Sequence, residues 1–321
     1  MNENRKLFLK NVDKIYDSAS KRSPGELQFT YEGILYPTTI CSLGNFQALE
    51  GFEAIKDDVI LVTYPKSGTM WVYQIIQEIV YTATNRSPSS DISLIELGAP
   101  DHLECLKQQP SPRVLHTHLH YNNIPTSIFK TTAKKLVLFR NPKDTAVSYF
   151  HFYNSSPMFP TFSTWDEFFK HFMSGKVCWG SYFESLLTWN KHLDDEDVMI
   201  ITYEDLKEGL FRWELFLLVL NRWKGRNLVA GVKQIAEFLG FPLNQKQIQA
   251  IADQSTFQNM KVNYQGTHSQ FAQALFRKGV IGDWRNYFSP AQNQEMDTKF
   301  KEYLGETKLG AKLKYDTYCK A

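Results

Sequence analysis

Residues 63–71, with the sequence TYPKSGTMW, combine one lysine, one glycine and several hydroxyl side chains. The apolar run 58–62 precedes them, and the helix-like run 72–80 follows them. A strand, a tight polar loop and a helix N-terminus together form a geometry that binds phosphate. The loop is not a Walker A motif, because Lys66 comes before the only glycine rather than after a second one. Considered alone, the loop is explained equally well as a strand-to-helix turn with a solvated lysine.

The backbone of this loop could bind an anion. Pro65 restricts the exit from the strand, and a glycine three residues later permits a turn. The helix dipole would help the following N–H groups to point at one anion. These N–H groups belong to Ser67, Gly68, Thr69 and Met70. Lys66 adds a positive charge that could stabilise an oxygen as it leaves in a group transfer.

Two further basic segments could bind a second anion. Arg140 ends an apolar run, and the following Asn141 and Pro142 are typical of the start of a helix. Ser148 lies about two turns into that helix, on the same face as its start. Residues 277–279, Arg-Lys-Gly, place two cations before a glycine. Each segment alone is explained more simply as a capped helix or a solvated turn, but together they favour a second phosphate site.

Three histidines alternate in the sequence HTHLH at 116–120. If this segment is a strand, His116, His118 and His120 share one face. One histidine could act as a general base beside the anion loop, or a pair could bind zinc. The histidines could also simply end a surface strand. Periodicity leaves all three interpretations open.

The elements that position these residues follow from alternating apolar runs and helical patterns. We predict strands at 59–63, 113–117, 136–139 and 198–202, and helices at 70–84, 142–154, 165–174 and 182–192. This alternation is typical of an α/β fold with a central parallel β-sheet flanked by helices. Such sheets bind ligands outside the carboxyl ends of their strands, where Lys66, His116, His118, Arg140 and Tyr203 fall. We see no linker and predict a single domain over 1–321, with a motif-bearing core at about 50–285.

The composition limits the partners. The chain has 321 residues, 43% of them hydrophobic, and a net charge of +2, which is too small for broad binding to nucleic acid or membrane. No run reaches the roughly 18 apolar residues of a membrane span, and the first residues lack the apolar core of a signal peptide. Four scattered cysteines without C-x-x-C spacing indicate reduced thiols and a cytoplasmic location.

Three blocks of the sequence resemble the cytosolic sulfotransferase family. They are YPKSGTMW at 64–71, RNPKDTAVS at 140–148 and RKGVIGDW at 277–284, in the family's order. The stretches 117–121 and 309–315 are most similar to the 6B branch. The resemblance implies a P-loop-like strand, loop and helix around a donor, 3′-phosphoadenosine 5′-phosphosulfate (PAPS), and a hydroxyl or amine acceptor.

The resemblance also implies roles for single residues. His118 matches the family's catalytic base, and Lys66 matches the lysine that stabilises the leaving oxygen. The positions that match contacts to the 5′-phosphosulfate of PAPS are Lys66, Ser67, Gly68, Thr69, Met70 and Trp71. Those that match contacts to the 3′-phosphate are Arg140, Ser148, Arg277, Lys278 and Gly279. Those that match contacts to the adenine, or elsewhere along the nucleotide, are Trp71, Tyr203, Ser255, Thr256 and Phe257. No metal is implied, which disfavours the zinc interpretation.

The chain departs from the family pattern at several positions. His116 stands where the family often has lysine, which predicts weaker or more pH-dependent activity. Met70 replaces a common second threonine, which predicts weaker donor binding at most. The family's dimer motif is altered at Arg285, 289–290 and Gln294, which puts the usual homodimer in doubt.

Residues from about 210 to 227 interrupt the family pattern. They are too few to span a membrane. They could extend a helix or form an apolar docking patch. We favour an inserted segment without function, which could disturb Tyr203 just upstream.

The expected function is PAPS-dependent sulfotransfer by in-line displacement with a histidine base. The expected acceptor is a small hydrophobic phenol such as thyroxine, because the variable loops near 36–46, 96–108, 157–162 and 258–275 are rich in apolar and aromatic residues. These include Phe46, Phe159, Phe162 and Phe271. The alternative is a catalytically impaired protein of the same fold that binds PAPS or its product, 3′-phosphoadenosine 5′-phosphate (PAP). A zinc hydrolase and an NTP-dependent kinase fit less well.

Overall fold

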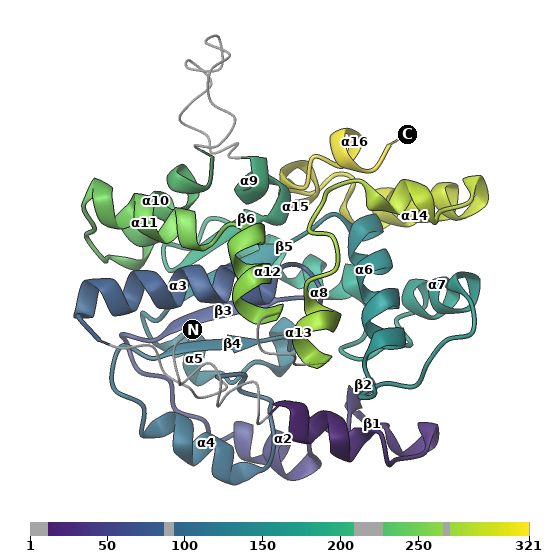
Figure 1. The fold of residues 1–321 in the computed structure, drawn as a ribbon, viewed down its shortest axis with the longest axis horizontal. Helices are drawn as coiled ribbons and strands as arrows, with labels where there is room; N and C mark the ends of the chain where they lie inside the picture. Colours follow the sequence, from purple (N-terminus) through teal and green to yellow (C-terminus); the bar gives the residue numbers. More distant parts are fainter. Residues whose placement is uncertain (1–11, 87–92, 209–226, 266–269, 321) are drawn as a thin grey trace.

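The computed structural model of the chain describes residues 12–86, 93–208, 227–265 and 270–320 (Figure 1). Residues 209–226, which include almost all of the predicted insertion, lie outside the described residues. The strands are β1 (Gln28–Tyr31), β2 (Ile34–Pro37), β3 (Val59–Thr63), β4 (Val114–Thr117), β5 (Lys134–Phe139) and β6 (Val198–Thr202). The α-helices are α2 (Leu43–Leu49), α3 (Thr69–Thr84), α4 (Pro100–Lys107), α5 (Ser127–Lys130), α6 (Pro142–Ser155), α7 (Trp165–Met173), α8 (Tyr182–Trp189), α9 (Tyr203–Glu208), α10 (Asn227–Leu239), α11 (Gln245–Gln254), α12 (Phe257–Gln265), α13 (Gln270–Leu275), α14 (Pro290–Leu304), α15 (Lys308–Lys312) and α16 (Tyr315–Tyr318). Short 3₁₀ helices occur at η1 (Pro24–Glu26), η2 (Tyr121–Asn123), η3 (Asn190–His192) and η4 (Asp283–Asn286), and residues 12–19 are helical up to Ala19.

The central sheet has four parallel strands in the order β4-β3-β5-β6. The predicted strands at 59–63 and 198–202 are confirmed as β3 and β6. Strand β4 begins one residue after its predicted start, and β5 begins two residues before its own. The predicted α/β fold, a central parallel sheet flanked by helices, is therefore confirmed.

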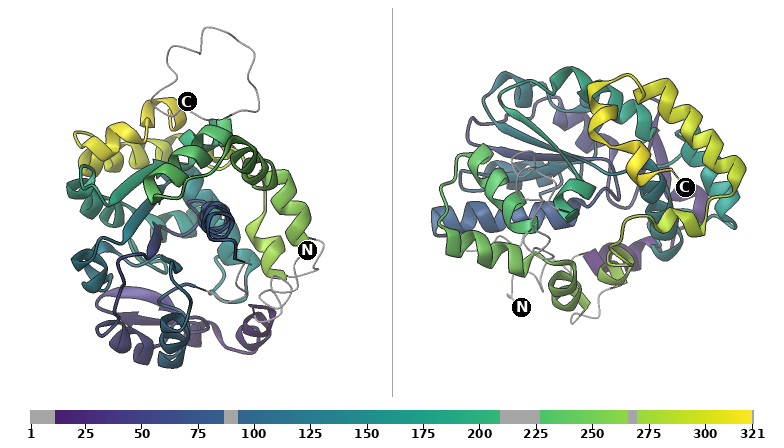
Figure 2. Two further views of the ribbon diagram at one scale, coloured as in Figure 1. Left: turned by 90° about the vertical axis from the view of Figure 1, so that its left-hand side faces the viewer. Right: turned by 90° about the horizontal axis from the view of Figure 1, so that it is seen from above.

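Each strand of this sheet is covered on both faces, as parallel sheets require. Val59 and Leu61 of β3 pack with residues of α3, α10 and α11, whereas Ile60 and Val62 pack with residues of α6, α7, α8 and α14. This alternation follows from the two-residue period of a strand. Seen from above in Figure 2, α10 and α11 and the C-terminal helices lie on opposite sides of the sheet. The ends of the strands are therefore held rigidly from both faces.

The helices begin where the sequence predicts their caps. The Asn141 side chain accepts a hydrogen bond from the Asp144 N–H, and Pro142 occupies the first position of α6. Helix α3 follows Gly68, whose φ of 109° few other residues could adopt. The predicted helices at 70–84, 142–154 and 165–174 each differ from the observed ones by one residue at one end, and the predicted helix at 182–192 is α8 followed by η3.

The two ends of the described chain share one core. A single cluster of buried side chains contains both Val12 and Cys319, which supports the prediction of one domain. Strands β1 and β2 form a separate antiparallel pair. Among the described residues, none of the helices has the length and apolar character needed to cross a membrane.

Candidate active site

A cavity opens where the strands of the central sheet end. Lys66 follows β3, His118 follows β4, Arg140 follows β5 and Tyr203 follows β6, and all four line this cavity. The carboxyl ends of parallel strands are the usual place for a ligand. The structure therefore brings together residues from four separate segments, as the sequence analysis expects.

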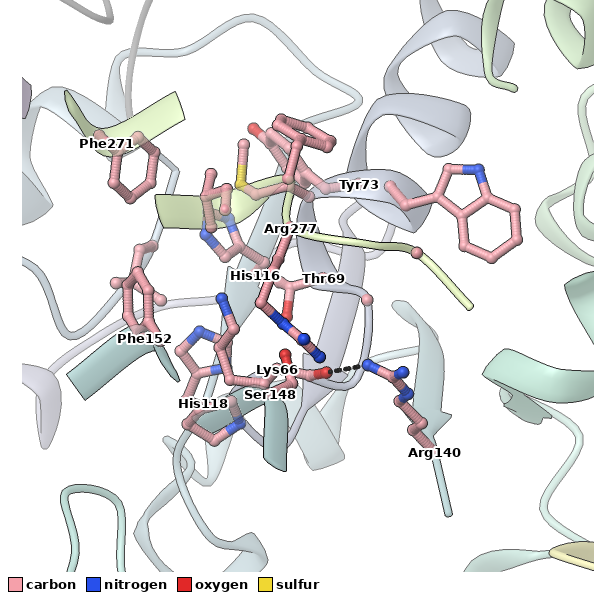
Figure 3. A pocket seen from close by; sticks show the side chains of 18 of the residues that line it. Lys66, Thr69, Tyr73, His116, His118, Arg140, Ser148, Phe152, Phe271 and Arg277 are labelled. Carbon is pink, nitrogen blue, oxygen red and sulfur yellow. Dashed lines mark hydrogen bonds between the residues drawn. The ribbon is translucent and has the colours of Figure 1, made fainter. Parts of the chain in front are cut away.

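The cavity has two chemically different parts. We call one part the basic end, and its residues are Lys66, Arg140, Arg277 and Lys278. We call the other part the apolar end, and its residues are Val12, Ile15, Ile40, Phe152, Met158, Phe159, Phe271 and Leu275. Figure 3 shows Phe152 and Phe271 on one side of the cavity and Arg140 on the other, with Lys66 and His118 between them.

The loop between β3 and α3 has an unusual backbone. Lys66 and Gly68 both have positive φ angles, 68° and 109°. A Cβ atom at Gly68 would lie 2.8 Å from the Tyr203 ring, so a larger residue would collide there. Ser67 is buried, and its hydroxyl has no hydrogen-bond partner among the described residues. An unpaired buried hydroxyl costs free energy, which a ligand that bonds to this hydroxyl would recover.

Lys66 reaches from this loop toward the apolar end. Its Nζ lies 3.8 Å from the centre of the Phe152 ring. Burial, together with the nearby charges of Arg140 and Arg277, lowers the pKa of Lys66 to about 7. An anion bound in the loop would favour the charged form and raise this pKa. Lys66 is therefore poised to gain its charge when a negatively charged ligand binds.

Backbone carbonyls orient Arg140 at the basic end. Its Nη1 donates to the Lys66 carbonyl at 3.3 Å, and its Nη2 donates to the Val280 carbonyl at 3.1 Å. The guanidinium lies 4.5 Å from the centre of the Tyr203 ring. Its Nε is buried and has no partner in the part of the chain that the structure describes. Ser148 of α6 lines the same cavity, so the predicted pair is brought together.

The segment 277–279 joins the basic end from the C-terminal part of the chain. Arg277 and Lys278 both pair with Asp283, at 2.6 Å and 2.7 Å. Burial raises the pKa of the Asp283 carboxyl, but the hydrogen bonds from Lys278 and Arg277 outweigh it and hold that pKa at about 2. Gly279 has a φ of 64°, and a Cβ there would lie 2.3 Å from the Phe257 ring. Only glycine therefore fits between this segment and Phe257.

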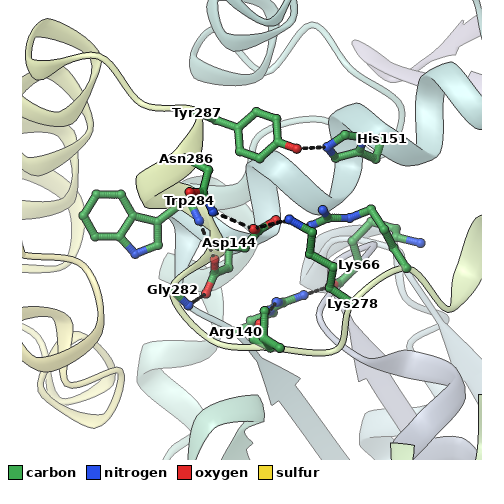
Figure 4. A network of polar contacts seen from close by, with 12 residues as sticks. Lys66, Arg140, Asp144, His151, Lys278, Gly282, Trp284, Asn286 and Tyr287 are labelled. Atoms are coloured by element: carbon green, nitrogen blue, oxygen red, sulfur yellow. Dashed lines mark hydrogen bonds and ion pairs between the residues drawn. The ribbon is translucent and has the colours of Figure 1, made fainter. Parts of the chain in front are cut away.

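Two residues that the sequence analysis missed hold this segment in place. The Asp144 carboxylate accepts hydrogen bonds from the backbone N–H groups of Gly282 at 2.7 Å and Trp284 at 3.0 Å (Figure 4). Lys207 donates to the Gly279 carbonyl and lies 5.5 Å from the centre of the Phe257 ring. The position of Asp144 in the first turn of a capped helix was a sequence feature that could have identified it. Lys207 gave no signal, because its partner is 72 residues away.

His118 is held in one tautomer at the end of β4. Its Nδ1 lies 2.9 Å from the Thr63 carbonyl oxygen and 3.0 Å from the Thr63 hydroxyl; because the carbonyl can only accept, we assign the proton to Nδ1. The other ring nitrogen, Nε2, then bears the lone pair that a general base needs. Burial lowers the pKa of His118 to about 4; the bond to Thr63 opposes this effect and the charge of Lys66 adds to it.

The other two histidines differ from the sequence expectation. Strand β4 ends at Thr117, and His120 does not line the cavity; its Nε2 contacts the Trp179 carbonyl at 2.7 Å. The prediction that all three histidines share one face is therefore wrong. His116 does line the cavity, but burial lowers its pKa to about 3. The lowered pKa favours the neutral form of His116 near pH 7, and weaker or more pH-dependent activity stays a prediction.

The residues predicted to contact the adenine side lie near α12. Trp71 and Phe257 line the cavity, and the Trp71 Nε1 donates to the Ser255 carbonyl at 2.7 Å. The Ser255 hydroxyl is buried and unpaired within the described chain. Thr256 is exposed and instead caps α12 by accepting from the Asn259 N–H at 3.3 Å.

The predicted acceptor loops contribute only in part. Phe159 and Phe271 line the apolar end. Phe46 instead packs 4.5 Å from Tyr36, centre to centre, in the core, and Phe162 packs 5.2 Å from Phe168. Both assignments to the cavity are therefore wrong, because an aromatic residue in a loop serves a core as readily as a pocket.

The site fits a nucleotide that carries two phosphate groups. Unpaired buried groups occur at both predicted ends of such a ligand, on Ser67 and Arg140 and on Ser255. Met70 lines the cavity, and its backbone keeps the N–H that the prediction requires. Within the described residues, no three His, Cys, Asp or Glu side chains gather in a group that could hold a metal ion.

Comparisons with known proteins agree with this geometry. The sulfotransferase domain profile matches residues 56–213 and 225–308, which leaves 214–224, part of the predicted insertion, between the matched segments. Sulfotransferase 6B1 of the chimpanzee, Pan troglodytes, is 49% identical over 313 residues, 97% of each chain. The zebrafish (Danio rerio) protein of the same name is 42% identical over 94% of this chain and 97% of its own. The crystal structure of mouse sulfotransferase SULT7A1 complexed with PAP is 34% identical, with a TM-score of 0.76 over 91% of this chain and 99% of that chain.

The resemblance to the 6B branch is thereby confirmed. A domain profile that covers most of the chain, and relatives that are nearly half identical over its whole length, show that this protein belongs to the sulfotransferase family.

Proposed function

We propose that this protein transfers the sulfuryl group of PAPS to a hydroxyl, or an amine, of a small hydrophobic acceptor. The observation that carries the proposal is the cavity itself, in which a basic end and an apolar end meet at Lys66 and His118. A basic end alone would suit any nucleotide. An adjoining apolar end gives a second reactant a place within reach of the first.

His118 and Lys66 divide the chemistry of the transfer. PAPS supplies the sulfuryl group, which passes in line between two oxygens. The Nε2 of His118 accepts the proton of the acceptor hydroxyl as its oxygen bonds to sulfur. The Nζ of Lys66 contributes positive charge where negative charge grows on the leaving phosphate oxygen. Positioning of the two reactants then supplies most of the remaining rate.

The residues that would hold PAPS are those predicted from the sequence. Lys66, Ser67, Gly68, Thr69, Met70 and Trp71 would surround the 5′-phosphosulfate; Arg140, Ser148, Arg277, Lys278 and Gly279 would bind the 3′-phosphate; Tyr203, Ser255, Thr256 and Phe257 would face the nucleotide. The unpaired buried groups of Ser67, Arg140 and Ser255 support this assignment. The exposed position of Thr256 gives it the weakest support of the set.

The acceptor that fits best is a phenol such as thyroxine. A flat aromatic ring suits a cavity end lined by Phe152, Phe159 and Phe271. We keep the cytoplasm as the proposed location. Within the altered dimer motif, Ser289 caps α14 and Pro290 takes the first position of that helix, which keeps the family's usual homodimer in doubt.

A catalytically impaired protein that only binds the nucleotide is the second candidate. The neutral His116 in the cavity favours it, because the lysine common at this position would bring a positive charge. The deciding experiment combines transfer of ³⁵S-sulfate from labelled PAPS to a panel of phenols, steroids and amines with calorimetric binding of PAP. Turnover of any acceptor supports transfer. Tight PAP binding without turnover supports the second candidate, and absence of PAP binding contradicts both.

A further inference from the structure

A segment that follows α3 places Glu96 beside His118. Leu94 forms a parallel bridge with His116, and backbone hydrogen bonds of 2.9 Å and 3.0 Å flank this bridge. Two residues further along both segments, the parallel register brings Glu96 next to His118. The Glu96 side chain is fully buried there. A carboxyl group without access to water requires a structural or chemical reason.

The Glu96 carboxylate binds three donors around the proposed base. Its Oε1 accepts from the His118 backbone N–H at 2.7 Å and from the Trp179 Nε1 at 3.2 Å. Its Oε2 accepts from the Thr117 hydroxyl at 2.8 Å. The Trp179 ring in turn packs edge-on against the His118 imidazole, with 5.2 Å between the ring centres. One carboxylate therefore fixes both the backbone and one neighbour of His118.

Glu96 changes its charge in an accessible pH range. Burial raises the pKa of Glu96 to about 7, although the bonds from His118 and Thr117 oppose this effect. The other titratable groups near the carboxyl are Tyr36 and Cys41, and burial raises the pKa of each, so both are neutral near pH 7. All three donors to the carboxylate are neutral as well.

Lys66 is the further group that titrates near His118. It faces the imidazole from the loop after β3, and its pKa is about 7. Protonation of Lys66 affects the reaction in the opposite direction to protonation of Glu96. Falling pH charges Lys66, which favours the donor, whereas falling pH neutralises Glu96. The two groups can therefore be separated.

We propose that Glu96 is the positioning residue of His118 and that only its ionised form holds His118 and Trp179 in the arrangement needed for proton transfer. This inference rests on the proposed function, in which His118 is the base. Protonation places a hydrogen on one carboxylate oxygen, and that oxygen then loses a donor. When that oxygen is Oε1, the His118 N–H and the Trp179 Nε1–H lose their acceptor, and Nε2 of His118 no longer faces the acceptor hydroxyl. Sulfuryl transfer accordingly slows as the pH falls through neutrality.

Single-turnover rates from pH 5.5 to 9, with saturating PAPS, test this directly. In the parent, the rate should fall as the pH drops through about 7. Glu96→Gln keeps an oxygen for the His118 N–H but cannot ionise, so the rate at pH 8 should fall roughly tenfold and the acidic decline should disappear. Thr117→Val removes a donor that lowers the pKa of Glu96, so the decline should move up by about one pH unit.

Two results would overturn the inference. The first is an acidic decline that persists unchanged in Glu96→Gln, which would assign the decline to a group other than Glu96. The second is a loss of PAP affinity or of thermal stability in Glu96→Gln that matches the loss of rate, which would show a general structural role. The inference requires PAP affinity within about twofold of the parent.

A measurement without turnover separates this inference from the proposed function. The His118 imidazole signals are followed by NMR in ¹⁵N,¹³C-histidine-labelled protein bound to PAP, which keeps Lys66 charged. These signals should shift between pH 6 and 8 in the parent and stay fixed in Glu96→Gln. If the parent shows this difference but transfers no sulfate, the proposed function fails while the positioning role stands. Signals that do not shift in the parent overturn the positioning role.

Discussion

The basic end and the apolar end of the cavity are built in different ways. The basic end consists of Lys66 and Arg140, which follow strands, and of Arg277 and Lys278 in the RKG segment, so each belongs to a short local sequence motif. The apolar end draws Val12, Phe159 and Phe271 from three distant parts of the chain. Binding an anion needs backbone N–H groups and charges at set positions, whereas binding an apolar acceptor needs only a surface of suitable shape. The first requirement leaves a motif in the sequence and the second does not.

The largest expected effect lies where the two ends meet. His118→Ala should lower kcat by about 10²- to 10⁴-fold, because it removes the general base, while PAP affinity stays within twofold. Steady-state rates and calorimetry measure the two quantities. His171→Ala is the control and should keep the parent rate, because His171 does not line the cavity; its Nδ1 contacts the Glu167 carbonyl and its ring packs against Phe162. A loss of less than tenfold at His118 would mean that another group accepts the proton.

The next effect isolates the basic end. Gly279→Ala forces a Cβ to within 2.3 Å of the Phe257 ring, so PAP should bind at least tenfold more weakly. Gly240→Ala is the matched control, since Gly240 also has a positive φ, 77°, but has nothing within 4 Å of an added Cβ. The control should lose about 1 kcal/mol of stability without any change in PAP affinity. Equal PAP affinities for both variants would contradict the proposed role of 277–279.

The pH dependence of PAP binding tests the contribution of Lys66 to the basic end. Lys66, with a pKa of about 7 in the free protein, is charged below that pH and neutral above it. Bound phosphate favours the charged form, so the Kd of PAP should rise by up to about tenfold per pH unit above pH 7. Calorimetry between pH 7 and 9 measures this, because the phosphates are already ionised there. Lys66→Arg stays charged and should flatten the dependence; an equal slope in both proteins would assign it elsewhere.

The smallest expected effect belongs to the apolar end. Phe271→Ala should raise the KM of a phenol acceptor about fivefold, because it removes one wall of a surface that other side chains continue. PAP affinity should not change. Val262→Ala on the adjacent helix is the control, since that side chain is 59% exposed and does not line the cavity. If Phe271→Ala weakened PAP as much as the acceptor, the two ends would not be independent.

The sequence predicted the fold closely because its signals are local. Burial of β3 on both faces requires an unbroken apolar run, and Asn141 with Pro142 marks the start of α6. The same locality explains why Lys66 and Arg140 were placed at the cavity. Phe46 and Phe162 were wrongly assigned to the acceptor pocket, because the sequence does not show whether an aromatic side chain packs in the core or lines a cavity.

The chain order alone was enough to name the α/β fold, the anion loop and the family, since each depends on neighbouring residues whose backbone preferences act over one turn or one strand. The contact between Glu96 and His118 could not be predicted from the sequence. That contact joins residues 22 positions apart through the register of two parallel segments. Neutrality of His116 and the pKa of Lys66 near 7 likewise arise only after folding, because both are consequences of burial.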